Sequence, residues 1–294
     1  SPEQYRCIAA SISNSITINL ASFSNLKDIC VELLQDEKRK GCNILLLKLI
    51  SNQHRDIFSV LCEDLINSIS SVTNESQLVQ ELLNRFEKWK SLFDRAATQG
   101  LSVEEQRGLF GEIHFLRKFL TNNNRFLEVV NSWVGPEKQI RDFQSGSWSV
   151  EIKTTHGNNH QKILVSSERQ LDTSNLEYLF LNHISLDSRQ MSGETLNHII
   201  DAVLVLLEND FTALTRFKNK LLSAGYFDQQ KNYYEHTGYF IRQDVTFLVG
   251  HSFPRIEEDD IRDGVGDVKY SIIVSHCSDF IRTDEQVFKT LIFT

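Results

Sequence analysis

A tight turn between two strand-like segments constrains the fold of this chain more than any other feature. Residues 139–143 and 148–155 lie on either side of Gly146-Ser147, and a Gly-X pair is a recognised two-residue hairpin loop. Counting outward from this loop in equal steps places Asp142 directly opposite Glu151. Directly opposed residues have Cβ atoms roughly 4.5–5.5 Å apart. The sequence therefore predicts a hairpin in which two carboxylates face each other.

The second strand of this hairpin contains the triplet Glu151-Ile152-Lys153. Strand alternation directs the side chains of Glu151 and Lys153 to the same face as Asp142. Like charges that face each other destabilise a strand pair unless a cation lies between them, and oxygen ligands with open coordination positions suit Mg²⁺. Lys153 can orient a water beside such a metal or help to deprotonate it. The pattern is typical of a metal-dependent phosphodiesterase centre.

A charged stripe on a strand is also typical of an ordinary solvated sheet face, and this alternative stays open. Asp36-Glu37-Lys38 has the same spacing but belongs to a charged run without strand patterning. Asp267-Val268-Lys269 opens a strand-like segment after a predicted loop. Because no obvious helix acid or hairpin partner accompanies it, this last triplet is the second candidate for the site.

A helix is predicted to begin at Ser102, which has the S-x-x-E spacing of a capping box with Glu105. At about 100° per residue, Glu112 falls inside the apolar arc of this helix, where a carboxylate is costly unless it has a hydrogen bond or a nearby cation. A role beside a metal site and a salt bridge at the core boundary explain Glu112 equally well. Gly108 and Gly111 each lower helix propensity by up to about 1 kcal/mol relative to Ala, which indicates that a sheet packs closely against this turn.

A short apolar run at residues 162–165 leads to a second helix start, with S-x-x-Q spacing from Ser167 to Gln170. The free N–H groups and positive dipole end of this helix would lie beside the predicted site, where they can meet a phosphate. Ser167, Arg169 and Gln170 are therefore candidate substrate-binding residues. Simple helix capping is the alternative.

The order of these features resembles the PD-(D/E)XK nuclease superfamily: a helix acid, an Asp on one strand, E-x-K on the next, then a further strand and helix. Arg141 stands where the superfamily's name has Pro. This departure makes the name less apt, but the residues that would carry the chemistry are present. Within the superfamily, the chain resembles a bacterial family of PD-(D/E)XK-motif proteins found near restriction and phage-defence genes. This resemblance is strong over residues 100–175 and depends on the phrases Gly108-Leu109-Phe110-Gly111-Glu112, Trp133-Val134-Gly135-Pro136, Arg141-Asp142-Phe143, Glu151-Ile152-Lys153-Thr154-Thr155 and Ser166-Ser167-Glu168-Arg169-Gln170-Leu171.

The resemblance implies a restriction-endonuclease-like α/β fold, in which helices flank a central mixed β-sheet. It also implies Mg²⁺-dependent hydrolysis of nucleic-acid phosphodiesters, with Mn²⁺ able to replace Mg²⁺. Asp142, Glu151 and the Ile152 carbonyl would be metal ligands. Lys153 would be the catalytic lysine, and Glu112 would be the auxiliary helix acid.

Composition is consistent with such an enzyme but less specific. The chain has 294 residues, of which 40% are hydrophobic, enough for one large or two modest domains. Its five cysteines include no C-x-x-C pair, which argues against a zinc ribbon or a disulfide framework and favours a reducing cytoplasm. No apolar run approaches the roughly 18 residues of a membrane span, and the start has no signal-peptide pattern. We therefore expect a soluble, cytoplasmic protein with no membrane partner.

The formal net charge of −8 is the main objection to a nucleic-acid substrate, because such proteins commonly carry a basic field. The charge near the predicted site partly answers the objection. Between residues 137 and 169, five Lys and Arg residues outnumber four Asp and Glu residues. A bound Mg²⁺ would add two further positive charges.

The remaining patterns predict an α+β accessory region at residues 1–100 and a nuclease core at residues 101–294. The accessory region could bind DNA, a partner protein or a second subunit. Expected elements outside the site are strands and loops before residue 53, helices near 55–70, 77–97, 193–208 and 211–224, and strands at 176–186, 239–249 and 268–276.

The function predicted from these observations is a DNA endonuclease of a restriction or phage-defence system, with a homodimer or defence-system proteins as possible partners. Two other classes stay open. One is a catalytically silent DNA-binding or scaffold subunit of a defence complex, against which the intact Asp, Glu and Lys argue. The other is a structural protein whose charged face pairs with a partner chain, in which Asp142→Ala and Glu151→Ala would leave function unchanged.

Overall fold

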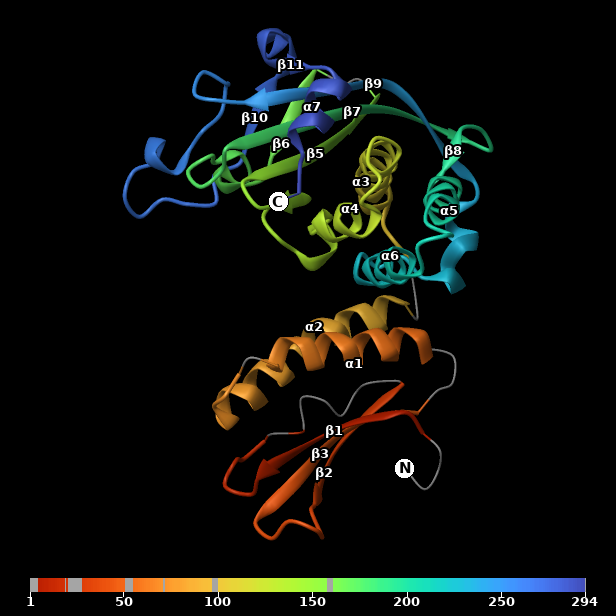
Figure 1. Cartoon of the computed structure of the whole chain (residues 1–294), viewed down its shortest axis with the longest axis vertical. Helices are drawn as coiled ribbons and strands as arrows, with labels where there is room; N and C mark the ends of the chain where they lie inside the picture. Colours follow the sequence, from red (N-terminus) through yellow and green to blue (C-terminus); the bar gives the residue numbers. More distant parts are fainter. Residues whose placement is uncertain are drawn as a thin grey trace. The chain divides into compact units, whose positions relative to one another are not determined.

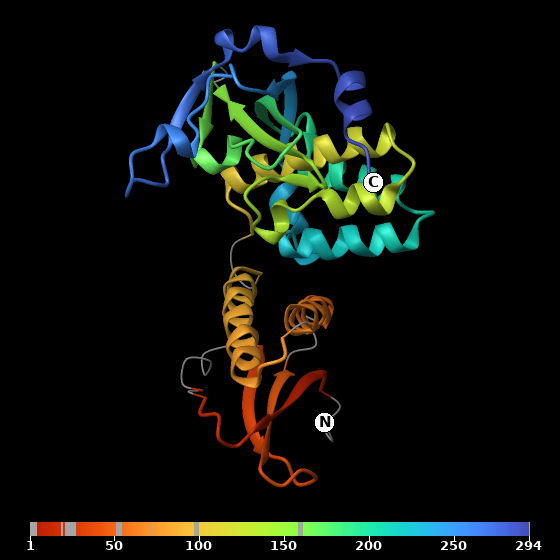
Figure 2. The same ribbon diagram turned by 60° about the vertical axis from the view of Figure 1, so that its left-hand side comes forward.

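The computed structural model divides the chain into two units, residues 1–99 and 100–294, which Figures 1 and 2 show from two sides. The structure describes residues 5–18, 20, 28–50, 55–70, 72–96, 100–157 and 161–293. Each unit contains its own β-sheet. The predicted boundary falls between residues 100 and 101, one residue after the division between the two units.

The first unit is a three-stranded antiparallel sheet with two helices. The sheet has the order β1 (Cys7–Ser13), β3 (Cys42–Leu49) and β2 (Ile29–Gln35). Alternate residues of β3 are buried, as a sheet covered on one face requires. The helices are α1 (Arg55–Ile69) and α2 (Glu75–Ala96), and their buried leucines and phenylalanines complete this core. This unit is the α+β region expected from the sequence.

The second unit is built on a six-stranded mixed sheet with the order β11-β9-β7-β5-β4, in which β8 also pairs with β9. Strands β5 and β7 run parallel, from Trp148 beside Tyr178 to His156 beside Leu186. The other neighbours in this sheet are antiparallel. The strands are β4 (Phe143–Ser145), β5 (Trp148–His156), β7 (Tyr178–Gln190), β8 (Glu194–Thr195), β9 (Thr237–Val249) and β11 (Ile281–Arg282).

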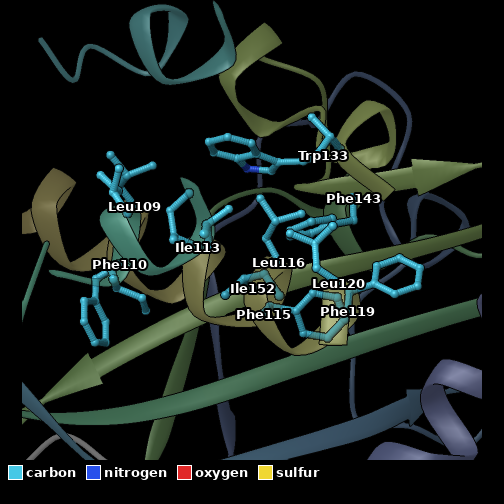
Figure 3. Packing of buried hydrophobic residues seen from close by; sticks show 14 of the residues in the cluster. Leu109, Phe110, Ile113, Phe115, Leu116, Phe119, Leu120, Trp133, Phe143 and Ile152 are labelled. Carbon is cyan, nitrogen blue, oxygen red and sulfur yellow. The ribbon is translucent and has the colours of Figure 1, made fainter. Parts of the chain in front are cut away.

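Helices cover one face of this sheet, and a small second sheet covers the other. Val150, Ile152 and Phe180 pack with the helices, whereas Leu179 and Leu181, which alternate with Phe180, pack with the two-stranded sheet. Figure 3 shows the α3 side chains of the helical layer around Ile152. The helices are α3 (Val103–Thr121), α4 (Phe126–Ser132), α5 (Leu196–Leu206), α6 (Phe211–Ser223) and α7 (Asp284–Thr290), and the small sheet pairs β6 (Lys162–Val165) with β10 (Tyr270–Ile273). The expected α/β fold, with helices flanking a mixed sheet, is confirmed.

Helix α3 begins with the predicted capping box. The Glu105 N–H donates to Ser102 Oγ at 3.3 Å, and the Ser102 N–H donates to Glu105 Oε2 at 2.9 Å. The two glycines of this helix have different surroundings. A Cβ on Gly111 would lie 2.4 Å from Thr154 Cγ2 on β5, whereas a Cβ on Gly108 would have nothing within 4 Å. The predicted close approach of the sheet therefore holds for Gly111 and is wrong for Gly108.

Four predicted elements differ from the structure. The helix predicted from Ser167 is only one 3₁₀ turn, η5 (Glu168–Leu171), because a capping pattern sets where a helix begins and not how far it continues. The strand predicted at 268–276 is limited to β10, since residues 274–276 form a 3₁₀ turn. The helix predicted from residue 193 begins at Leu196, after the short strand β8.

The fourth difference is in the hairpin. Residues 139–141 are not a strand, and β4 consists of residues 143–145. The reason is that the Asp142 carbonyl accepts hydrogen bonds from the N–H groups of Val134 and Gly135, at 2.8 and 2.9 Å. These bonds direct the chain before β4 away from β5.

In the described part of the chain, no helix has the length and apolar character needed to cross a bilayer.

Candidate active site

The hairpin register counted from the sequence is confirmed. Ser145 pairs with Trp148, and Phe143 pairs with Val150. Gly146 has φ +53°, which a two-residue turn of this kind requires at its first position and which glycine adopts without a Cβ clash. The next residues outward from the turn are Asp142 and Glu151, so both lie where β4 begins and β5 continues beyond it.

Asp142 caps the open edge of β5. Its Oδ2 accepts a hydrogen bond from the Ile152 N–H at 2.7 Å. In a longer hairpin, a backbone carbonyl of the partner strand would accept this bond. The Asp142 side chain thus supplies the acceptor at the point where the backbone before β4 no longer pairs with β5. The carboxylate is fixed at the strand edge, and its Oδ1 lies near Gly135.

Glu151 is buried and is bonded through only one of its oxygens. Its side chain is 2% exposed, and Oε1 lies 2.8 Å from Lys153 Nζ. Oε2 has no hydrogen-bond partner among the residues that the structure describes. Lys153 Nζ also donates to Gln170 Oε1 at 3.1 Å, and that oxygen accepts a second bond from the Ser166 N–H at 3.0 Å. The turn η5 therefore holds the end of the lysine against the acids.

Glu112 reaches the same place from helix α3. Its Oε2 accepts a hydrogen bond from Trp133 Nε1 at 2.7 Å. Gly135 lies beside both Glu112 and Asp142, because a Cβ on Gly135 would lie 2.7 Å from Glu112 Oε2 and 3.1 Å from Asp142 Oδ1. The structure thus brings together the four residues predicted as catalytic, namely Glu112, Asp142, Glu151 and Lys153.

Burial makes these acids unusually weak. Burial raises the pKa of Glu151 to about 8, and the nearby charge of Asp142 contributes to this increase. Burial also raises the pKa of Asp142 to about 6, although the Ile152 N–H and Lys153 oppose it. The pKa of Glu112 is raised well above its usual value, first by burial and then by Asp142. Three carboxylates and one ammonium in a poorly solvated place favour the entry of a further cation.

A divalent cation fits the oxygen atoms that this place offers. In the described ranges, no three His, Cys, Asp or Glu side chains form a group able to hold a metal ion. Mg²⁺, however, is usually held by one or two carboxylates, while waters and substrate phosphates fill its other positions. Asp142 and Glu151 supply two such carboxylates, and the buried, unpartnered Oε2 of Glu151 is the atom that most needs a cation.

Of the three predicted substrate-binding residues, only Gln170 contacts the predicted catalytic residues, through Lys153. Ser167 caps η5, since its Oγ accepts from the Arg169 N–H at 3.4 Å. Arg169 pairs with Glu258 at 3.1 Å and is 57% exposed. Ser167 therefore has the alternative role stated above, which is simple capping. A single turn of four residues has no long helix dipole behind it, so the expected long helix is wrong, and phosphate binding at this turn stays a prediction.

Sequence reasoning missed two residues that shape this place. Arg141 donates from Nε to the Gln170 carbonyl at 3.0 Å and from Nη2 to the carbonyls of Arg169 and Asp172, so it fixes η5 beside the site. Trp133 orients Glu112. The only signals were the position of Arg141 directly before Asp142 and the Trp-Val-Gly-Pro phrase, and neither indicates such contacts.

The second candidate triplet does not form a site of the predicted kind. Asp267 has φ +55° and lies in irregular backbone, outside β10. The Val268 N–H donates to Glu168 Oε2 at 2.8 Å. This segment therefore supports η5 through its backbone, and the prediction that it opens a strand is wrong.

Comparison with known proteins places the chain in a family. No curated protein and no solved structure matches the chain. The model of a family described as "Putative PD-(D/E)XK family member, (DUF4420)" matches residues 1–275. The match includes Glu112, Asp142, Glu151 and Lys153 and covers far more than half of the chain. The chain therefore belongs to this PD-(D/E)XK family.

Proposed function

We propose that this protein is a metal-dependent nuclease that hydrolyses DNA phosphodiester bonds in a restriction or phage-defence system. The family supports a nuclease-like protein. The observation that carries the proposal is the meeting of three weakly solvated carboxylates with Lys153, where one buried oxygen of Glu151 has no partner among the described residues. A purely structural cluster of this composition would be costly, because buried like charges have little to offset them.

Two carboxylates and one carbonyl would hold Mg²⁺, or Mn²⁺ in its place. Asp142 would contribute Oδ1 and Glu151 would contribute Oε2, since their other oxygens already accept from Ile152 and Lys153. The N–H and C=O of one strand residue point to the same side. Because the Ile152 N–H points to Asp142, we expect the Ile152 carbonyl to face the same open edge.

The bound metal would activate a water and stabilise charge on the phosphate. Lys153 would position that water or offset the negative charge that develops on the phosphate oxygens. Gln170 keeps Lys153 in place, because its Oε1 accepts from the ammonium and is itself fixed by the Ser166 N–H. Glu112 would bind an outer-shell water or a second metal ion. Trp133 occupies its Oε2 and leaves the other oxygen for this role.

DNA is the proposed substrate, and it would bind through its phosphates to the region near η5. The local excess of basic residues between 137 and 169 partly offsets the net charge of −8. The first unit, residues 1–99, would act as an accessory region that binds DNA, a defence-system partner or a second copy of the chain. We propose these partners together with the nuclease activity.

A plasmid cleavage assay tests the proposal. We expect the parent to cut plasmid DNA with Mg²⁺ or Mn²⁺ and to lose this activity in EDTA. Lys153→Ala should remove cleavage, whereas Lys218→Ala, the same change at an exposed position of α6, should not. Equal nicking by Lys153→Ala and the parent would contradict the assignment. Binding of DNA by the parent without any cleavage would favour a silent DNA-binding or scaffold subunit instead.

A further inference from the structure

Lys220 on helix α6 is almost completely buried, which is rare for a lysine. Its side chain is only 2% exposed. The ammonium donates to the main-chain carbonyls of Trp133 and Asn131, the latter at 3.1 Å, and lies 3.1 Å from Glu137 Oε1. Burial lowers the pKa of Lys220 to about 8, although Glu137 opposes this effect. A costly buried charge is thus used to hold one short segment, residues 131–137.

This segment forms one wall of the candidate active site. Trp133 donates its indole N–H to Glu112. Val134 and Gly135 donate their N–H groups to the Asp142 carbonyl. A shift of the segment would therefore move two of the three carboxylates together.

Helix α6 holds Trp133 at both ends. Lys220 binds its carbonyl, and Phe217, one turn earlier, packs against its ring with a centroid distance of 5.9 Å. A lysine near the C-terminus of α4 also offsets that helix's dipole. A capping role alone would affect stability, but it would not connect Lys220 to the indole N–H.

We propose that Lys220 is a positioning residue of the active site, which acts through Trp133 on the carboxylate of Glu112. The contacts form a continuous path from the Lys220 ammonium to the Trp133 backbone, from the Trp133 indole to Glu112, and from Glu112 past Gly135 to Asp142. The catalytic consequence of this path rests on the proposed nuclease function. The structural coupling between Lys220 and Glu112 through Trp133 does not depend on that function.

The coupling can be measured without activity, from the indole N–H signal of Trp133 in a ¹H–¹⁵N NMR spectrum. The chain has three tryptophans, and Trp133→Phe identifies the signal. We expect Lys220→Met to shift it, because the hydrogen bond to Glu112 is disturbed. The matched control is Arg216→Met on the same helix. Arg216 also binds Asn131 and Glu137, but through their side chains, and is 39% exposed.

Activity and metal binding supply the second measurement. We expect Lys220→Met and Trp133→Phe each to lower kcat and Mn²⁺ affinity about tenfold, as loss of an outer-shell contact typically does. The KM for DNA should stay the same. The double variant should be no worse than either single variant, because both act through one contact. Arg216→Met should match the parent.

The outcomes separate the two proposals. An unshifted Trp133 indole signal in folded Lys220→Met would overturn the positioning role, whatever the enzyme does. If Lys220→Met does not fold, Lys220→Leu, which also removes the N–H donor, is subject to the same criterion. A shifted signal in Lys220→Met, together with a parent that neither binds Mn²⁺ nor cuts DNA, would support the coupling and reject the nuclease function.

Discussion

Without divalent metal, the folded protein should lose stability as the pH rises from 5.5 to 7.5, because of Glu151. Burial raises the pKa of this carboxyl from an ordinary 4.5 to about 8. Across that window the folded chain keeps a proton that an unfolded chain has already released. Stability is therefore highest at low pH and falls until the pH passes the folded-state pKa.

The size of the effect follows from one proton over two pH units. Each pH unit changes the free energy of unfolding by about 1.4 kcal/mol per proton, so Glu151 contributes a loss of about 3 kcal/mol between pH 5.5 and 7.5. Asp142, with its pKa raised to about 6, acts in the same direction in the lower part of this range. A bound divalent cation stabilises the ionised acids, so Mg²⁺ should reduce or reverse the loss.

Urea denaturation in EDTA at the two pH values measures this directly. Glu151→Gln, which cannot ionise, should show a pH-dependent loss smaller by about 3 kcal/mol than the parent. Glu208→Gln, the same change at an exposed position, should behave like the parent. Comparison between variants removes the contribution of titrating groups that do not interact with Glu151. An identical pH dependence in the parent and Glu151→Gln would refute the argument that this carboxyl is buried and protonated.

The glycines provide further predictions. Gly111→Ala places a Cβ 2.4 Å from Thr154 Cγ2 and should destabilise the protein by about 1–3 kcal/mol in urea denaturation. Gly108→Ala, on the same helix with nothing within 4 Å, should instead stabilise it by up to about 1 kcal/mol; equal effects would contradict the packing. Gly135→Ala places a Cβ 2.7 Å from Glu112 Oε2 and 3.1 Å from Asp142 Oδ1, so it should weaken Mn²⁺ binding about tenfold in a titration, and unchanged binding would show that these two carboxylates do not support a metal site.

The parts of the site that depend on neighbouring residues could be predicted from the sequence. Hairpin register follows from a two-residue loop and from alternation, both of which are local. The capping box that begins α3 is local in the same way. Asp142, Glu151 and Lys153 therefore lie together as the sequence indicates, with distances that the structure supplies.

The parts that depend on distant residues could not be predicted. Nothing near Lys220 in the sequence indicates that its ammonium meets the carbonyl of Trp133, 87 positions earlier. Gly108 and Gly111 have the same apparent meaning in the sequence, and only the course of β5 distinguishes them. The helix expected after Ser167 was too long, because tertiary contacts, including those of Arg141, end it after one turn.

The two-residue loop between β4 and β5 also limits how the length of this hairpin can change. Side chains alternate strictly along a strand, so the parity of the loop length decides which side of the sheet receives each residue of β4. One inserted residue at Gly146-Ser147 that shifted the pairing by one position would turn Asp142 to the helical side, away from Glu151. An insertion at this corner would therefore separate the two carboxylates of the proposed site.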